Sequence, residues 1–238
     1  MIQELLRASH VSDLRARSQK VLSICITVKN RSRVEVDGKQ LLLLPNCIKS
    51  IAGCVKPEDN AELVISDWHS DDWPLEEWVE EAAKPIPVKL VTVDGCFSRG
   101  KGRNVAADNA RGEILLFLDA DIIISREVVA WGLKHVAAGK VFFPEYYKFG
   151  DPEGRTKTWV HGSFGNVMIR RDTFLRAGKW PELKSWGAED NMFHEAVKRL
   201  VPTERPRPPG FYHQWHPDTL GWKDRYADPK CGGIIGAR

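Results

Sequence analysis

The 238-residue sequence has no apolar run long enough to cross a bilayer, because a spanning helix needs about 20 consecutive apolar residues. The first twenty residues are too rich in charge for a secretory signal. The sequence also has no internal repeat and no low-complexity segment. These absences argue against a membrane-spanning, repetitive or disordered chain, and we expect a globular protein that its own sequence does not export.

A disulfide framework is also not indicated. The five cysteines are an odd number, and no two of them form a Cys-x-x-Cys pair. They are Cys25, Cys47, Cys54, Cys96 and Cys231. Scattered cysteines among apolar neighbours are typical of reduced core residues, whereas disulfide-stapled and zinc-binding domains show close, repeated spacings. We therefore expect reduced cysteines and a cytoplasmic location.

The net charge of +3 is small for this length, and the basic residues are not concentrated on one element. This distribution argues against a nucleic-acid partner, although it would not repel an anionic substrate. Residues 1–20 mix leucine and isoleucine with arginine and predict a basic helical arm. An ordinary surface helix is the favoured interpretation, and a peripheral membrane or partner contact remains open.

Apolar segments alternate with helical patterns through the first 140 residues. The expected strands are 21–30, 61–72, 88–95 and 115–124. The expected helices are 41–55, 74–84 and 125–139, with 100–112 as a loop that leads into a helix. Because the strands are apolar on both faces and helices separate them, the fold class is α/β with a mainly parallel, helix-covered sheet.

The remainder of the chain is more mixed. Strands are expected within 140–150 and 159–171, and a helix at 188–200. No linker divides the chain, so we expect one Rossmann-like domain at 21–220, between the arm at 1–20 and a tail at 221–238.

Acidic residues stand where three of the expected strands end. The apolar part of one strand ends in Asp67, that of the next in Asp94, and that of a third in Asp119 and Asp121. Ligands of open parallel sheets bind at the carboxyl ends of the strands. One aspartate at a strand end is ordinary turn chemistry, but three such ends on one rim favour a site.

The stretch LLFLDADIII (115–124) places Asp119 and Asp121 two residues apart, so on an extended chain both project to one side. Two carboxylates so close would raise one pKa unless a cation or a set of donors intervenes. Mg²⁺ or Mn²⁺ held between carboxylates and phosphate oxygens would meet this need. From these residues alone, a turn with both acids in water is the better interpretation.

The preceding segment, SRGKGRNVAADNARGE, changes that balance. It brings Arg99, Lys101 and Arg103 together with two glycines just before a helix. Glycines allow close approach of the backbone, and the cations can neutralise phosphates. A flexible basic loop is the alternative, but beside a carboxylate pair we favour contact with phosphate.

The segment 188–200 has an apolar stripe at helical spacing. Glu189 and Asp190 lie in its first turn, where the helix dipole favours charged carboxylates. Acidic residues are common at helix starts, but Trp186 and Gly187 just before them favour a pair that faces a cleft.

The late segment FYHQWHPD (211–218) sets His213 and His216 among aromatic residues. A lone histidine is more often a packing residue, but two here are compatible with one completing a metal site. Their spacing is not that of a zinc site. Which of the two would bind stays open.

Taken in order, these segments resemble the inverting GT-A glycosyltransferases of family 2. The resemblance rests on SICITVKNR, ELVISD and SRGKGRNVAADNARGEILLFLDADI, whose family counterpart joins a nucleotide-binding Arg-Asn segment to an Asp-x-Asp metal motif. The stretch FGNVMIRRDTFLRAGKWPELKSWGAEDNMF is similar to the C-terminal region of galactosyltransferases and chondroitin polymerases, where Trp-Gly-x-Glu-Asp carries the acceptor site and the base. YHQ is similar to the family's late metal-binding histidine. SDWHSDD replaces the usual Asp-Asp-Gly-Ser, and KNRSR is more basic than usual.

The resemblance covers residues 21–220 and implies a GT-A fold with a nucleotide-sugar part at 21–124 and an acceptor part at 140–220. It implies a nucleotide-diphosphate-sugar donor, most often UDP-linked, with Mn²⁺ or Mg²⁺ and a hydroxylated acceptor such as a glycan, as in polysaccharide biosynthesis. The implied donor contacts are Thr27, Asp67, Arg99, Arg103, Asn104, Asp119 and Ala120.

The resemblance also implies roles in the reaction. Asp121 and one histidine would hold the metal, and Asp119 would contact the ribose or the ion. Asp190 would be the base of a single, inverting displacement. The implied acceptor contacts are Glu189, Trp186 and Gly187.

Two other functions remain in view. A nucleotidyltransferase that makes sugar nucleotides would normally have a glycine-rich loop after its first strand, and KNRSRVEV offers none. A non-catalytic nucleotide-sugar or glycan-binding module would keep the aromatic residues but would have no need of Asp190.

Overall fold

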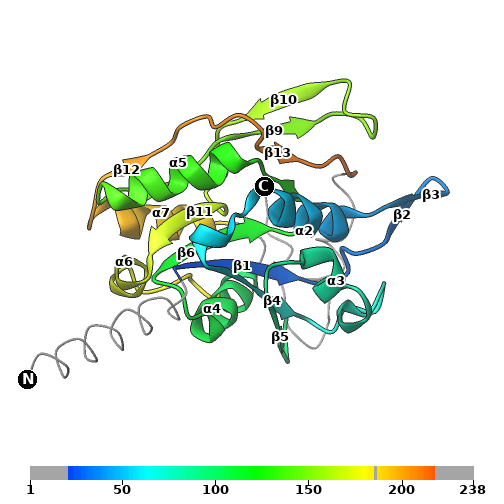
Figure 1. The fold of residues 1–238 in the computed structure, drawn as a ribbon, viewed down its shortest axis with the longest axis horizontal. Coiled ribbons are helices and arrows are strands. Elements are labelled where there is room, and N and C mark those ends of the chain that lie inside the picture. Colours follow the sequence, from blue (N-terminus) through cyan, green and yellow to red (C-terminus); the bar gives the residue numbers. More distant parts are fainter. Residues whose placement is uncertain (1–20, 185–186, 218–238) are drawn as a thin grey trace, which may run out of the picture.

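The computed structural model describes residues 21–184 and 187–217, and its elements are labelled in Figure 1. The strands of the large sheet are β1 (Leu22–Val28), β4 (Ala61–Asp67), β5 (Val88–Thr92), β6 (Ile114–Asp119), β8 (Val141–Phe142), β11 (Val167–Arg170) and β12 (Thr203–Glu204). The helices are α2 (Leu43–Cys54), α3 (Val79–Ala83), α4 (Arg99–Asn109), α5 (Arg126–Ala137), α6 (Arg171–Arg176) and α7 (Glu189–Lys198), with 3-10 turns η1 (Pro57–Asp59) and η2 (Leu75–Glu77).

The central sheet has seven strands in the order β12-β8-β11-β6-β1-β4-β5. Strands β6, β1, β4 and β5 are parallel, whereas β11 runs antiparallel to β6 and β8. Thr27 pairs with Asp119 on one side, and Val28 with Asp67 on the other. The register therefore brings the carboxyl ends of the parallel strands to one edge, as expected for an α/β ligand site.

Helices cover both faces of this sheet, which explains why its strands are apolar on both sides. One core joins alternate residues of the central strands to α2, α3 and α5. The other core joins the intervening residues to α4, α6 and α7. Figure 1 shows α2 and α5 on one side of the central sheet and α4 and α6 on the other.

A smaller sheet lies beside the large one and has the order β10-β9-β13-β7. Its strands are β7 (Ile122–Ile123), β9 (Tyr146–Phe149), β10 (Lys157–Val160) and β13 (Tyr212–His213), and β2 (Val34–Val36) pairs separately with β3 (Lys39–Leu41). His213 pairs with Ile122, directly after the aspartates, and with Lys148. The late histidine segment thus lies next to the end of β6.

The expected α/β class and mainly parallel sheet are confirmed, and two local predictions differ. The stretch predicted as a helix at 74–84 forms only η2 and α3. Within 100–112, helix α4 already begins at Arg99, since the hydroxyl of Ser98 accepts a hydrogen bond from the Lys101 backbone N–H. The glycine content suggested a loop, but a Cβ on Gly102 would lie 1.9 Å from Thr27 Oγ1. That glycine therefore allows α4 to pack closely on β1.

The cysteine expectation is only partly correct. Cys25, Cys47 and Cys54 are free and buried. Cys96 is disulfide-bonded, so the expectation that all cysteines are reduced is wrong for this residue. Cysteine usage therefore no longer supports the expected cytoplasmic location. Cys231, the basic arm and the C-terminal tail lie outside the described residues. None of the helices in the described ranges is long and apolar enough to span a membrane.

A buried carboxylate fixes the amino ends of three central strands. Glu62 on β4 is 2% exposed and accepts hydrogen bonds from Ser23 Oγ at 2.7 Å and from Arg111 Nε at 3.0 Å. The Arg111 backbone N–H also donates to Glu62, and Ser23 accepts from the Gly112 N–H. Burial raises the pKa of Glu62, but these hydrogen bonds and the Arg111 charge outweigh burial and lower it below its ordinary value.

Glu62→Gln is predicted to lower the free energy of unfolding at pH 7 by about 1–3 kcal/mol, because it breaks a buried charge-assisted network. A carboxylate with a lowered native pKa stabilises the fold above its unfolded pKa, and that contribution is lost as the pH falls through the native pKa. The difference between wild type and variant should therefore shrink below about pH 4.5, the ordinary glutamate value.

Urea unfolding at several pH values measures this difference. Glu58→Gln is the control, because Glu58 is exposed on η1 and forms a long ion pair with Lys56 at 3.9 Å. A pH-independent difference for Glu62→Gln would contradict the role of the ionised carboxylate.

Candidate active site

A cleft of about 540 Å³ opens at the carboxyl edge of the central sheet and is bounded by the small sheet and the start of α7. The predicted site residues that line it are Thr27, Arg99, Asp119, Ala120, Asp121, Gly187, Asp190, His213 and His216. These residues come from β1, α4, the end of β6, the start of α7 and the β13 region. The chain therefore brings most of the predicted site into one cavity.

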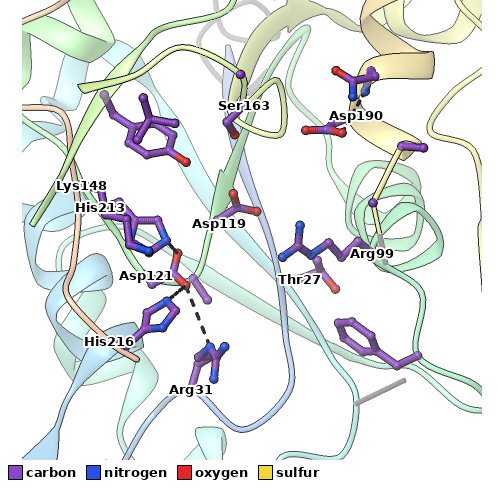
Figure 2. Close-up of a pocket in the computed structure, with 18 residues that line it drawn as sticks. Thr27, Arg31, Arg99, Asp119, Asp121, Lys148, Ser163, Asp190, His213 and His216 are labelled. Atoms are coloured by element: carbon purple, nitrogen blue, oxygen red, sulfur yellow. Dashed lines mark hydrogen bonds and ion pairs between the residues drawn. The ribbon is translucent and has the colours of Figure 1, made fainter. Parts of the chain in front are cut away.

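Asp121, His213 and His216 form a compact group on one side of the cleft (Figure 2). One ligand atom from each lies within 4.8 Å of the other two. Asp121 Oδ1 is 3.5 Å from His213 Nε2, and Asp121 Oδ2 is 3.3 Å from His216 Nε2. Within the part of the chain that the structure describes, this group contains both histidines but does not contain Asp119.

The histidine tautomers suit a cation. His213 Nδ1 is 2.7 Å from the carbonyl of Gln214, and His216 Nδ1 is 3.1 Å from the carbonyl of Pro217. A carbonyl only accepts, so each Nδ1 carries the hydrogen, and in the neutral imidazole Nε2 presents a lone pair. Asp121 Oδ1 and His216 Nε2 are buried without a hydrogen-bond partner among the described residues. This donor set fits a divalent metal ion.

Positive charge also surrounds Asp121. Arg31 Nε lies 4.0 Å from Asp121 Oδ2, and both side chains are largely buried. Burial raises the pKa of Asp121, but His213, His216 and Arg31 together hold this pKa well below its ordinary value. The carboxylate is therefore ionised at neutral pH and available as a ligand.

Asp119 is neutralised differently. Arg103 Nη2 donates to Asp119 Oδ1 at 2.8 Å, and Asn166 Nδ2 donates to Oδ2 at 3.3 Å. Asn166 Oδ1 in turn accepts from the Asp119 backbone N–H at 2.9 Å. A Cβ on Gly165 would lie 2.5 Å from Arg103 Nη2, so the neighbouring glycine leaves room for the guanidinium. The two aspartates of the DAD stretch therefore have separate sets of partners.

Asp190 lies at the start of α7, across the cleft from the Asp121 group (Figure 2). Its Oδ2 accepts from the Phe164 backbone N–H at 3.3 Å, and its Oδ1 from its neighbour Asn191. Before the helix, Gly187 and Ala188 both have positive φ, at 88° and 71°. That conformation is rare for alanine, and it turns the chain so that α7 begins at the wall of the cleft.

Several predicted residues lie elsewhere. Asp67 accepts from Ser70, and Asn104 exchanges hydrogen bonds with the backbone of Trp180, so neither lines the cleft. Arg103 and Glu189 are buried behind the wall. Trp186 lies outside the described residues. The strand-end acid Asp94 is exposed and contacts His69 Nε2 at 2.7 Å.

Some residues of the site were not predicted from the sequence. Arg31, Tyr146, Lys148 and Ser163 line the cleft, and Asn166 holds Asp119 from behind. Burial raises the pKa of Tyr146 to about 12, although Ser163 opposes the rise, so its hydroxyl stays neutral. Only Arg31 had a sequence signal, in the unusually basic KNRSR segment. The other residues come from the second half of the chain, which carries weaker motifs.

Known proteins show which family the chain belongs to. The family model described as "Glycosyl transferase family 2" matches residues 23–184. The mouse chondroitin sulfate N-acetylgalactosaminyltransferase 2 is 28% identical over 151 residues, which cover 53% of this chain and 28% of that protein. The human chondroitin sulfate N-acetylgalactosaminyltransferase 1 is 26% identical over the same shares. The chain thus matches little more than a quarter of the length of these relatives.

Solved structures share the fold. Residues 1–349 of TarS from S. aureus give a TM-score of 0.65 at 19% identity, covering 82% of this chain and 60% of that chain. The same protein in complex with UDP-GlcNAc gives 0.65 at 20% identity, covering 83% and 59%. Because the family model spans more than half of the sequence, the chain belongs to glycosyl transferase family 2, and the solved structures show that it has the GT-A fold.

Proposed function

We propose that the chain is a metal-dependent, inverting glycosyltransferase that moves a sugar from a UDP-sugar to a hydroxyl of a glycan or other hydroxylated acceptor. The observation that carries the proposal is one cleft with Asp190 on one wall and the Asp121, His213 and His216 group on the other. A base and a metal site must face each other in this way if the acceptor and the leaving diphosphate are to lie on opposite sides of the anomeric carbon.

Residues on the metal side would hold the diphosphate. A bound divalent ion would neutralise the diphosphate and so make it a better leaving group. Asp121 would supply one oxygen ligand, and His213 and His216 one nitrogen each. Imidazole ligands suit Mn²⁺ better than Mg²⁺, which prefers oxygen. Arg99, which also lines the cleft, would offer its guanidinium to the phosphates.

Asp190 would act on the other wall. Its carboxylate would accept the proton of the acceptor hydroxyl while that oxygen forms its bond to C1 and the bond from C1 to the diphosphate breaks. Attack from the opposite face inverts the anomeric centre. The Phe164 N–H that donates to Asp190 would hold the carboxylate in place without neutralising it.

The comparisons support the choice of donor. One neighbour of the same fold is described in complex with UDP-GlcNAc, and the animal relatives are named N-acetylgalactosaminyltransferases. UDP-GlcNAc and UDP-GalNAc are therefore the first donors to test. The chondroitin-related names also make a glycan the first class of acceptor to examine.

Asp190→Asn is predicted to lower the kcat of UDP release from the accepted UDP-sugar by about 10²–10⁴-fold, because the amide cannot take the proton. The affinity for UDP with Mn²⁺ should change less than about twofold, since Asp190 lies across the cleft from the metal ligands. Coupled UDP-release kinetics and calorimetry measure the two quantities. Asp108→Asn, at an exposed position of α4 that pairs with Lys179, is the matched control. Near-normal turnover by Asp190→Asn would overturn its assignment as the base.

Chelation is predicted to weaken UDP binding by at least about tenfold, and Mn²⁺ should restore it more fully than Mg²⁺. His213→Ala and His216→Ala should each reduce the Mn²⁺-dependent part of the affinity, because each removes one ligand. Calorimetry of UDP binding with EDTA, Mg²⁺ or Mn²⁺ checks this. His135→Ala on α5, where the ring contacts the Trp131 carbonyl, is the control. Equal UDP affinity in EDTA and in Mn²⁺ would contradict a metal-dependent donor site.

A further inference from the structure

Glu189 is the least accessible carboxylate near the cleft. It is 2% exposed, it does not line the cavity, and neither of its oxygens has a hydrogen-bond partner among the described residues. Its sequence neighbour Asp190 does line the cavity. A buried charge of this kind is costly unless other charges compensate for it.

Two guanidinium groups of α4 compensate for the Glu189 charge. Glu189 Oε1 is 3.6 Å from Arg103 Nη1 and 3.7 Å from Arg99 Nη1. Arg103 is 1% exposed, and its Nε and Nη1 also lack hydrogen-bond partners among the described residues. Its guanidinium lies over the Trp180 ring at 4.4 Å. Glu189 is therefore the carboxylate nearest to the Nη1 atom of this guanidinium, which has no hydrogen-bond partner among the described residues.

The same guanidinium contacts Asp119 with its other nitrogen, at 2.8 Å. A continuous chain of charges thus runs from Asp119 at the end of β6, through Arg103 on α4, to Glu189 at the first residue of α7. Asp190 is the next residue of that helix. The position of Asp190 and the orientation of Arg103 are therefore tied to one buried carboxylate.

We propose that Glu189 is a positioning residue that holds Arg99 toward the donor, Arg103 against Asp119 and α7 toward the acceptor, rather than a contact for acceptor hydroxyls. This inference rests on the proposed function of the same cleft. Its physical basis is that an acceptor hydroxyl would have to reach a carboxylate buried behind Arg99, whose guanidinium is 3.7 Å away and itself lines the cleft.

Hydrolysis of the donor separates the two roles, because water then replaces the acceptor and no acceptor hydroxyls need to be held. Glu189→Gln is predicted to lower kcat for hydrolysis of UDP-GlcNAc or UDP-GalNAc by about 10–100-fold, since small displacements of catalytic groups have effects of this size. The affinity for UDP with Mn²⁺ should also weaken. An unchanged hydrolysis rate in Glu189→Gln would overturn the positioning role.

Two further variants distinguish positioning from general damage to the fold. Glu189→Asp keeps the carboxylate and should recover part of the rate. Arg99→Gln changes the more exposed partner, and its effect on UDP affinity should be much smaller in a Glu189→Gln background, because without Glu189 the Arg99 guanidinium is no longer held toward the phosphates. Additive effects would overturn the inference. Glu195→Gln on the exposed face of α7 is the matched control and should leave both readouts unchanged.

Measurements on the wild-type chain distinguish a failure of this inference from a failure of the proposed function. A wild-type chain that neither binds UDP nor hydrolyses any UDP-sugar with Mn²⁺ overturns the proposed function, and the inference with it. A wild-type chain that does both, combined with a Glu189→Gln chain that hydrolyses the donor normally, overturns the inference alone. Thermal unfolding of each variant shows whether any lost rate reflects lost structure.

Discussion

The contact between Arg103 and Asp119 is the interaction on which the rest of the site depends. A guanidinium that is 1% exposed must have its charge compensated, and Asp119 at 2.8 Å does so from the end of the central strand β6. The contact requires α4 and the 163–166 segment to approach closely. Gly102 lets α4 pack closely on β1, because a Cβ there would overlap Thr27. Gly165 lets the 163–166 segment pack against the Arg103 guanidinium, which a Cβ there would overlap. Backbone packing therefore delivers the charge to the sheet edge.

Asp119 and Asp121 are separated by one residue, yet the fold gives them different surroundings. Asp119 receives a hydrogen bond on each carboxylate oxygen, one from a guanidinium and one from an amide. Asp121 faces two imidazole nitrogens that can act as ligands, and one of its oxygens lacks a hydrogen-bond partner among the described residues. A carboxylate of the second kind is better suited to binding a cation. The motif spacing alone could not make this distinction, because it depends on which elements reach each side chain.

This division marks what the sequence could predict. The parallel strands, the strand-end aspartates and the late histidines were predictable, because each follows from local periodicity or from a motif with a fixed order. The contact of Asn166 with Asp119 was not predictable, because Asn166 lies 47 residues further along the chain, just before the antiparallel strand β11. The arginine partners of Glu189 were equally out of reach, since an acidic residue at a helix start is as compatible with solvent as with an ion pair. The start of α4 at Arg99 was missed, because the glycines that suggested a loop there serve tertiary packing.

The short segment 163–166 explains how the two walls of the cleft keep their relative positions. Its Phe164 N–H donates to Asp190, Gly165 leaves room for Arg103, and Asn166 binds Asp119 through both backbone and carboxylate. Few residues of the small sheet take part in these contacts. Substitutions on β9 and β10, which line the cleft through Tyr146, Lys148 and Val160, can therefore change its shape without breaking the hydrogen bonds that hold Asp119 and Asp190. The shape of the cleft and the alignment of its acids thus depend on different segments of the chain, because the hydrogen bonds to Asp119 and Asp190 named above come from α4 and 163–166 and not from the small sheet.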